Sequence, residues 1–567
     1  MKHFLSFCIA ALCFINCKSN VESKDQIEKL RGVTSKNAMV VSAREEASKI
    51  GVEILKQGGN AFDAMMATEM ALAVTYPYAG NLGGGGFLVY RLADGSKGAL
   101  DYREKAPSAA TKNMYLDDDE NIIPNKSTVG SMAIGIPGTI AGIFEAQKRF
   151  GKLEPSIILK PVIELAQNGY VITEKQELRI AHYDSLIRAV NGKEILYNNK
   201  LKFGDLIKNT ALAETLQRIA DNGQNEFYKG KIAEILVKEL QARGSIITME
   251  DLAKYEAKWR DPISFQYDDL TITSMSPPSS GGVCLNQIMT MVEPFDLKEL
   301  GHNSVEYTQV LVEAEKRSYA DRSHYLGDPD FVDMPIDTLT SKRYLSKRMA
   351  NFSFEKPTPV DSIARGKITG YESDQTTHYS IVDQFGNAIA VTTTLNGGYG
   401  SKVYIDELGF FLNNEMDDFS SKPGEPNYYG LIGAEANSIA PEKRMLSAMT
   451  PTIVEKNGEL YMSLGTPGGS TIITSVFQTI LNVHEFEMTM QQAVEAPRFH
   501  NQWLPDEIRM EPNRFSRSLI KELKELGYTI NETKSPIIGI VDGILVLDNG
   551  MLEGGADPRG DDIAVGF

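Results

Sequence analysis

Apolar residues recur along this chain with two periods, one typical of helices and one typical of strands. Residues 47–56 and 61–74 place them three and four positions apart, which predicts two amphipathic helices. The segments 87–90 and 99–103 are short apolar runs, and we expect buried strands there, the first one after a tight glycine loop at 83–86. The N-terminal part therefore combines helices with a β-hairpin.

The middle third is rich in helical patterns and shows no internal repeat. Amphipathic stretches predict helices at 161–167, 211–221, 231–243, 249–255 and 308–322. A loop of proline, serine and glycine at 277–282 precedes one more helix, which contains Cys284. We expect that cysteine to be a packed core thiol.

A polar segment at 354–375, with several prolines and glycines, indicates a linker or surface loop. The pattern then changes abruptly to β-branched, alternating residues at 376–382 and 388–395, around turn residues at 383–387. A hairpin is therefore predicted to begin at Thr376.

A second hairpin is predicted at 452–455 and 460–464, and its last strand leads through Gly468-Gly469 into an apolar helix at 471–483. Two glycines at a strand-to-helix turn offer unobstructed backbone amides near the positive end of a helix, as an oxyanion hole requires. A tight turn without chemistry explains the same pair.

The composition and net charge limit the classes of protein to which this chain can belong. The chain has 567 residues, 42% hydrophobic and 23% charged, which is typical of a soluble globular protein. Its length predicts two large structural units or one very large sandwich. With 58 Lys+Arg against 75 Asp+Glu the net charge is −17, and this acidic balance argues against nucleic acid and anionic membrane surfaces as partners.

The first residues form a separate unit. A short basic start is followed by an apolar run at 4–15, too short to span a bilayer and typical of a secretory signal. We predict a signal peptide at 1–17 and a polar leader at 18–32, with export to the bacterial envelope. Cys17 stands where a lipoprotein signal would be acylated, and simple cleavage before Val33 is the alternative. Only Cys284 remains afterwards, so no internal disulfide can form.

Several common sites are missing from the sequence. It contains no CxxC, HExxH, GxSxG or GxxxxGK[ST] motif, and its seven histidines are scattered. We therefore expect neither a metal site nor a cofactor.

Thr376 is the candidate nucleophile. A threonine hydroxyl reacts only when a base lies within hydrogen-bond reach, and its own α-amine can be that base if the residue is N-terminal. That requires the chain to be cut before Thr376, where a polar loop meets a strand. A buried strand threonine without chemistry is the alternative.

Several motifs together resemble the gamma-glutamyltranspeptidases, members of the N-terminal nucleophile hydrolase superfamily, and the resemblance spans residues 33–567. They are Gly58-Gly59-Asn60-Ala61-Phe62-Asp63-Ala64, Asp101-Tyr102-Arg103-Glu104, Pro137-Gly138-Thr139, Pro278-Ser279-Ser280-Gly281-Gly282, Thr376-Thr377-His378-Tyr379-Ser380, Leu412-Asn413-Asn414-Glu415-Met416-Asp417-Asp418-Phe419, Pro467-Gly468-Gly469, Ala496-Pro497-Arg498-Phe499-His500 and Asp557-Pro558-Arg559.

The resemblance implies an α+β fold, a four-layer αββα sandwich whose precursor cuts itself between Gln375 and Thr376. A large fragment, 33–375, and a small catalytic fragment, 376–567, would stay intertwined. Thr376 would attack both its own preceding peptide and a γ-glutamyl carbonyl, Thr394 would orient it, and Gly468 and Gly469 would supply the oxyanion amides.

The resemblance also implies how a glutamyl group is held. Its α-carboxylate and α-ammonium need partners of opposite charge. Arg103 and Ser447 match the carboxylate side, and Asn396, Glu415 and Asp418 match the ammonium side. Tyr429 resembles the lid tyrosine of bacterial members, although a surface aromatic on a long loop is the alternative.

One position departs from the family pattern. The family commonly has two serines before the Met-x-Pro-Thr strand, whereas this chain has Ser447 followed by Ala448. The loss of one hydrogen bond to a charged group weakens substrate binding by about 1.5–3 kcal/mol unless another group replaces it. The reaction class is unaffected.

We therefore expect a self-processing γ-glutamyl hydrolase and transferase that acts on glutathione and similar small molecules, with water, amino acids or peptides as acceptors. One alternative is a related acylase acting on a β-lactam side chain or poly-γ-glutamate. Another is an uncleaved, non-catalytic binding lipoprotein. A membrane would be contacted only through the possible lipid anchor.

Overall fold

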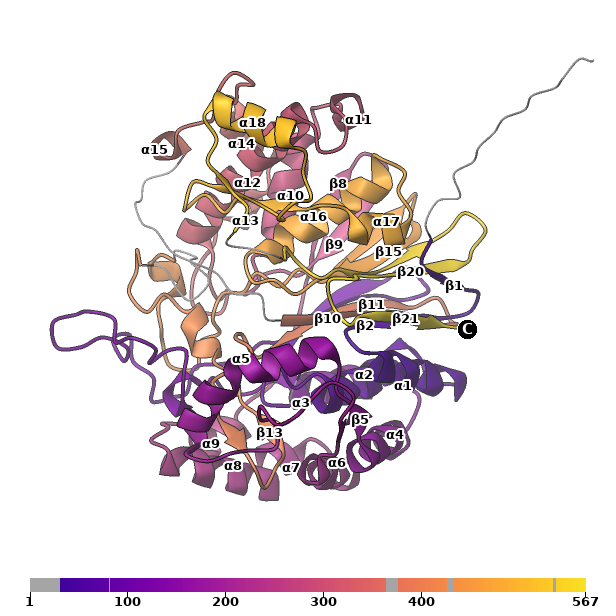
Figure 1. The fold of residues 1–567 in the computed structure, drawn as a ribbon, viewed down its shortest axis with the longest axis vertical. Helices are drawn as coiled ribbons and strands as arrows, with labels where there is room; N and C mark the ends of the chain where they lie inside the picture. The colour runs from indigo at the N-terminus through magenta and orange to yellow at the C-terminus, as the bar shows by residue number, and fades with distance from the viewer. Residues whose placement is uncertain (1–30, 81, 364–375, 426–432, 534–536) are drawn as a thin grey trace, which may run out of the picture.

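The computed structural model describes residues 31–80, 82–363, 376–425, 433–533 and 537–567. Two seven-stranded sheets lie face to face in the middle of the molecule, and helices cover both outer faces (Figure 1). This arrangement confirms the predicted α+β sandwich.

The first sheet has β10 near its centre. Its strands in spatial order are β21 (Ile563–Gly566), β2 (Met39–Ser42), β10 (Thr376–Val382), β11 (Ala388–Thr394), β3 (Gly85–Arg91), β4 (Lys97–Tyr102) and β7 (Lys258–Arg260). The helices on its outer face are α1 (Glu45–Lys56), α2 (Ala61–Thr75), α3 (Thr139–Phe150), α4 (Pro155–Asn168), α5 (Glu174–Asn191), α6 (Thr210–Asn222), α7 (Asn225–Tyr228), α8 (Lys231–Ala242) and α9 (Met249–Ala253).

The second sheet consists of β1 (Val33–Ser35), β20 (Leu552–Ala556), β19 (Asp542–Val546), β15 (Glu459–Gly465), β14 (Thr452–Lys456), β9 (Leu270–Ser274) and β8 (Ile263–Tyr267). On its outer side lie α10 (Gly281–Val292), α11 (Leu297–Leu300), α12 (Val305–Tyr325), α13 (Ile336–Leu339), α14 (Lys342–Met349), α15 (Val360–Ile363), α16 (Thr471–His484), α17 (Met490–Glu495) and α18 (Arg517–Leu526).

Short pairs and single turns complete the chain. They are β5 (Tyr170–Val171), β6 (Leu206–Ile207), β12 (Tyr404–Ile405), β13 (Phe410–Phe411), β16 (Phe499–His500), β17 (Ile508–Met510) and β18 (Ile530–Asn531), with the 3-10 turns η1 (Ser131–Ala133), η2 (Glu415–Asp418) and η3 (Glu435–Asn437).

Strand alternation divides the core into layers. Tyr379 and Ile381 of β10 pack toward the helices of the first sheet, whereas Val382 packs between the two sheets. Because successive residues of a strand point to opposite faces, the even-numbered positions of β10, Thr376 included, point toward the second sheet. On β11 the same rule places Thr394 on that face, together with the buried Ala390.

Strands from both sides of position 376 are mixed in each sheet. In the first sheet β10 pairs with β2 and β11 with β3, and in the second sheet β14 pairs with β9 and β20 with β1. The segments before and after Thr376 therefore share both layers of the sandwich.

The sequence predictions hold for most long elements but not for all boundaries. A helix expected to begin at Pro161 begins at Pro155, with Pro161 inside it, and α3 and α5 were not predicted. The described part of the expected linker contains the single turn α15. Cys284 is fully buried in α10, which confirms the core assignment.

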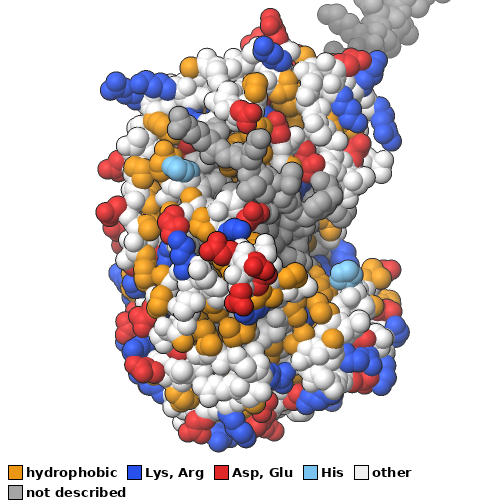
Figure 2. Space-filling view, turned by 90° about the vertical axis from the view of Figure 1, so that its left-hand side faces the viewer, with side chains coloured by type: hydrophobic (Ala, Val, Ile, Leu, Met, Phe, Trp, Pro, Cys, Tyr) orange, Lys and Arg blue, Asp and Glu red, His pale blue; other side chains and the backbone are white. Residues whose placement is uncertain are grey.

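Among the described residues, no helix combines the length and the apolar character that crossing a bilayer needs. On the face shown in Figure 2, acidic and basic side chains are interspersed and no continuous basic area is visible.

Candidate active site

One pocket opens where the two sheets meet, and it collects most of the residues singled out from the sequence. Its empty volume is about 310 Å³. The lining residues are Arg103, Arg322, Thr376, Thr394, Asn396, Glu415, Asp418, Ser447, Ala448, Met449, Gly469 and Ile472.

Thr376 and Thr394 lie directly opposite each other on β10 and β11. Their Oγ1 atoms are 3.4 Å apart, and both residues are at most 5% exposed. The Oγ1 of Thr394 accepts a hydrogen bond from the amide of Asn396 at 2.7 Å, and either hydroxyl of the threonine pair can donate to the other. The pair is therefore arranged to hold the Thr376 hydroxyl in one orientation.

The glycine run before β3 is explained by close backbone approach. Gly85 pairs with Thr394, and a Cβ at Gly84 would overlap the carbonyl group of Thr394. The run thus lets β3 approach β11 beside the pocket, in agreement with the tight loop expected from the sequence.

Arg103 occupies the centre of the charged half of the pocket and is 1% exposed. Its two terminal nitrogens donate to Glu415 and to Asp418 in close charge-assisted hydrogen bonds. Burial lowers the pKa of Arg103, but the attraction of these carboxylates outweighs burial and leaves the pKa above its usual range. Arg103, which is expected to bind the α-carboxylate of a glutamyl group, is thus bonded directly to Glu415 and Asp418. These two acids are expected to bind the α-ammonium of the same group.

The pocket holds more acid than one guanidinium can neutralise. Glu104, next to Arg103, is fully buried, and burial raises its pKa to about 8. Burial also raises the pKa values of Glu415 and Asp418, and Arg103 offsets this only in part. At neutral pH the cluster therefore retains a proton, which a cationic ligand group can replace.

Two asparagines hold the segment that carries these acids. The Asn413 side chain accepts from the amides of Gly135 and Glu415 and donates to the carbonyl of Gly83. Asn414 Oδ1 accepts from the Gly397 amide at 2.8 Å. Every part of this motif is tied to a neighbouring loop, so η2 is fixed in place rather than being a solvated loop.

The loop at 277–282 shapes the opposite wall. The amide of Ser280 donates to the carbonyl of Ser447 at 2.8 Å, and the Ser447 amide donates to the Pro278 carbonyl at 2.9 Å. The hydroxyl oxygen of Ser447 accepts from the Met449 amide, so its hydrogen is directed elsewhere. Ser447 can donate into the pocket, whereas Ala448 cannot do so with its side chain.

Gly468 and Gly469 connect β15 to α16 with φ angles of 138° and 54°. Both values lie in the region that favours glycine. Among the described residues neither amide donates to a backbone carbonyl, and Gly469 lines the pocket beside Thr376. Among the described residues, the turn therefore leaves two amide donors without a backbone acceptor next to the pocket that Gly469 lines.

Two residues of this site were not predicted. Arg322 of α12 lines the pocket and donates from Nε to Ser280 at 2.8 Å, and it lowers the pKa of Asp418. Glu104 belongs to the charged cluster described above. A signal for Arg322 was available, because charged residues surround the helix predicted at 308–322, which is unusual for a surface helix with one apolar stripe.

Three predicted site residues lie outside the described residues, namely Cys17, Gln375 and Tyr429, as do the predicted signal peptide at 1–17 and most of the predicted leader at 18–32. They remain predictions.

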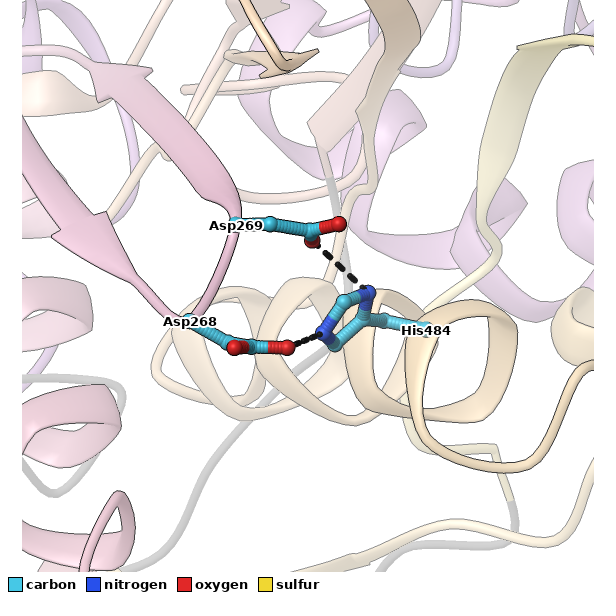
Figure 3. Close-up of side chains that lie close together, drawn as sticks. All are labelled: Asp268, Asp269 and His484. Atoms are coloured by element: carbon cyan, nitrogen blue, oxygen red, sulfur yellow. Dashed lines mark hydrogen bonds and ion pairs between the residues drawn. The ribbon is translucent and has the colours of Figure 1, made fainter.

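A separate group of ligand-type side chains lies at the far end of α16 (Figure 3). Asp268 approaches Nε2 of His484 at 3.1 Å, and Asp269 approaches Nδ1 at 3.9 Å. One ligand atom from each of the three residues lies within 4.8 Å of the other two, and both aspartates are exposed. The contacts connect the β8–β9 turn to the end of α16.

Comparison with known proteins shows to which family this sequence is similar. The sequence model described as Gamma-glutamyltranspeptidase matches residues 47–567. A protein named glutathione hydrolase proenzyme from Escherichia coli (strain K12) is 45% identical over 540 residues, which are 94% of this chain and 93% of that protein. A protein of the same name from Pseudomonas aeruginosa is 44% identical, over 92% of this chain and 93% of its own length.

Solved structures are similar as well. The crystal structure of Helicobacter pylori gamma-glutamyltranspeptidase is 42% identical with a TM-score of 0.55, over 57% of this chain and 94% of that chain. A cephalosporin acylase from Bacillus halodurans has a TM-score of 0.82 over 96% of this chain and 98% of its own. At 24% identity, the acylase shows a shared fold only.

His378, two residues after Thr376, predicts a dependence of stability on pH. It is fully buried between Thr392 and Ser380, and burial lowers its pKa from 6.5 to about 3. Between these values the unfolded chain binds a proton that the folded one does not, so stability is complete above pH 6.5 and falls with decreasing pH. In His378→Gln this slope should be shallower by up to about 1.4 kcal/mol per pH unit.

The measurement is urea unfolding at several pH values from 7 down to 4.5, with every protein carrying Thr376→Ala so that it stays one chain and unfolds reversibly. The exposed His182, replaced by glutamine, is the matched control and should keep the parental slope. Equal slopes for His378→Gln and the parent would show that this imidazole is not held neutral.

Proposed function

This chain belongs to the gamma-glutamyltranspeptidase family, and we propose that it is a self-processing γ-glutamyl hydrolase and transferase that acts on glutathione and related compounds through an ester on Thr376. The observation that carries the proposal is the single pocket in which Thr376 faces Gly469 on one side and the Arg103 cluster on the other. The name proenzyme, borne by the Escherichia coli relative, supports maturation by cleavage.

Maturation begins with the Thr376 hydroxyl attacking the carbonyl carbon of Gln375. The peptide shifts to an ester, and water then hydrolyses that ester, which leaves Gln375 with a carboxylate and Thr376 with a free amine. The mixing of strands in both sheets supports fragments 33–375 and 376–567 that stay together. The Helicobacter pylori chain is matched over 94% of itself but 57% of this chain, so it is a shorter polypeptide, as cleavage produces.

In turnover the Thr376 amine accepts the hydroxyl proton while Oγ1 attacks the γ-carbonyl carbon of the donor. The developing negative charge on the carbonyl oxygen is stabilised by the amides of Gly468 and Gly469. The carbon–nitrogen bond breaks, the leaving amine takes the proton, and a γ-glutamyl ester remains on Thr376. Water or an amino acid then attacks the ester and restores the hydroxyl. Thr394 keeps the nucleophile oriented from 3.4 Å.

Recognition of the glutamyl end proceeds by exchange of ionic partners. Without ligand, Arg103 is bonded to Glu415 and Asp418. The α-carboxylate of the ligand accepts hydrogen bonds from Arg103 and from the hydroxyl of Ser447. The α-ammonium of the ligand pairs with the carboxylates of Glu415 and Asp418 and displaces the proton that the acidic cluster retains. Asn396 completes the ammonium side, and Tyr429 covers the bound group as a lid.

The proposal includes export. Residues 1–17 act as the signal peptide and 18–32 as a leader, and an acyl chain on Cys17 would be the link to the membrane. The leader precedes β1, which is the first described strand.

Replacing Thr376 by alanine tests the proposal directly. The parent should show two bands on a denaturing gel, the smaller with 567 − 375 = 192 residues and an N-terminus at Thr376. Thr376→Ala should give one uncut chain that releases nothing from a chromogenic γ-glutamyl amide, because the hydroxyl is needed in both reactions. The exposed Thr111, replaced by alanine, should behave like the parent. An uncut parent would instead indicate the non-catalytic binding protein.

Restoring the second serine should tighten donor binding. In Ala448→Ser a second hydroxyl can donate to the α-carboxylate, so KM for the donor should fall about tenfold while kcat stays within about twofold. Steady-state kinetics on the γ-glutamyl amide measure this effect, and Ala242→Ser on the exposed face of α8 is the control. An unchanged KM would mean that Ala448 does not face the carboxylate.

A donor panel separates this activity from the related acylases. Because Arg103 binds the α-carboxylate through two charge-assisted bonds, converting that carboxylate to an amide should lower kcat/KM by about 100-fold or more. Cephalosporin side chains and poly-γ-glutamate complete the panel. Efficient turnover of donors without a free α-carboxylate would favour the acylase alternative.

A further inference from the structure

Two sequence motifs with no role in the proposed chemistry lie next to the Gly468-Gly469 turn. The first is residues 496–500 and the second is residues 557–559. Arg498 of the first motif and Asp557 of the second are fully buried and form an ion pair with a 2.6 Å separation. Arg498 also donates to the carbonyl of Gly539 at 2.9 Å, and the neighbouring Ile540 amide donates to Thr466 Oγ1 at 2.7 Å. The two motifs together thus brace the chain just before the turn.

His500, which ends the first motif, contacts the residue just after the turn. Its Nε2 lies 3.1 Å from Oγ of Ser470, which follows Gly469, and 3.0 Å from Oε1 of Gln502. Its Nδ1 lies 2.9 Å from Oγ1 of Thr474, one turn further along α16. The ring therefore connects the start of α16 to β16.

A third group holds Ser470 from another helix of the same layer. The hydroxyl of Tyr319, on α12, donates to the carbonyl of Ser470, and its ring meets His500 edge to face with centroids 5.4 Å apart. All three residues are fully buried. Main chain and side chain of Ser470 are thus both fixed, in surroundings where the loss of a partner leaves a buried polar group unsatisfied.

The direction of these hydrogen bonds follows from the chemistry of the ring. Burial lowers the pKa of His500 to about 3, with a further contribution from Arg509, so the imidazole is neutral. Oε1 of Gln502 only accepts, which requires the proton on Nε2 and leaves Nδ1 to accept from Thr474. The Ser470 hydroxyl donates to Oε1 of Gln502 at 2.7 Å, so its oxygen accepts from Nε2–H of the same tautomer. The Thr474 hydroxyl has the Thr471 carbonyl, at 3.1 Å, as a second acceptor beside Nδ1.

The turn itself cannot supply this rigidity. Two consecutive glycines have the widest backbone freedom of any pair, and both adopt positive φ angles here. This inference rests on the proposed function: we propose that His500 and Ser470 are positioning residues. They keep the Gly468 and Gly469 amides aimed at the oxygen of the carbonyl group whose carbon Thr376 attacks.

This role predicts a defined kinetic signature. The oxyanion exists only near the transition state, whereas Arg103 and Asp418, which bind the glutamyl end, lie on other elements. His500→Ala and Ser470→Ala should therefore lower kcat by about 10- to 100-fold while KM for the donor changes by no more than about twofold. Competitive inhibition by free glutamate should be unchanged.

Rescue by a similar side chain separates positioning from general packing. In His500→Gln the side-chain amide can donate as Nε2–H does, so this variant should recover part of the lost kcat. The control is Thr479→Val, which removes a buried hydroxyl from α16. That hydroxyl donates to the Ser475 carbonyl within the same helix. It should keep the parental kcat.

The experiment measures kcat, KM and the glutamate inhibition constant of each variant per mole of 192-residue fragment, with melting temperatures alongside. If His500→Ala does not fold, Ser470→Ala decides the question. An unchanged kcat in processed Ser470→Ala, or a KM that rises as kcat falls, overturns the proposal. An inactive or uncut parent would instead refute the function on which the proposal rests.

Discussion

The register between β10 and β11 is the constraint on which the rest of this site depends. Thr376 pairs with Thr394, and Thr394 in turn pairs with Gly85 across the next strand. A shift of β10 by one residue would turn the Thr376 hydroxyl away from the second sheet and into the helix-packed core, while Thr394 kept its orientation. Because β10 has neighbours on both sides and all its residues are buried, that register is fixed by the whole sandwich rather than by the pocket.

Electrostatics adds a second constraint. The guanidinium groups of Arg103 and Arg322 lie near three buried carboxylates, and burial raises the pKa values of Glu104, Glu415 and Asp418, which favours their protonated forms. Arg103 thus has ionic partners within the protein, whereas both oxygens of Glu104 and one of Glu415 are buried without a hydrogen bond among the described residues. Under the proposed function, a zwitterionic ligand offers a partner to each sign of charge, and a ligand with only one charged group would leave a buried charge without a partner.

The sequence predicted the hairpin at Thr376 well, because buried strands in this region alternate clearly and a polar loop precedes them. It also identified the glycine turn, but the roles of Arg103, Glu415 and Asp418 came from the resemblance, since no local pattern reveals which charged residues meet in a pocket. Arg322 was missed because charges on all sides of its helix indicate burial but do not show which charged side chain reaches a pocket. The direct bonds of Arg103 to both acids depend on tertiary structure, as does the bracing of the glycine turn by His500.

The interleaving of strands from both sides of position 376 has a consequence for the lifetime of the mature protein. Once the proposed cut is made, unfolding yields two separate polypeptides, and regaining the native state becomes a second-order encounter that dilution disfavours. Scission therefore converts a reversible equilibrium into a kinetic barrier. The cut protein persists because it unfolds slowly. Each molecule folds as one chain only once, before the cut is made.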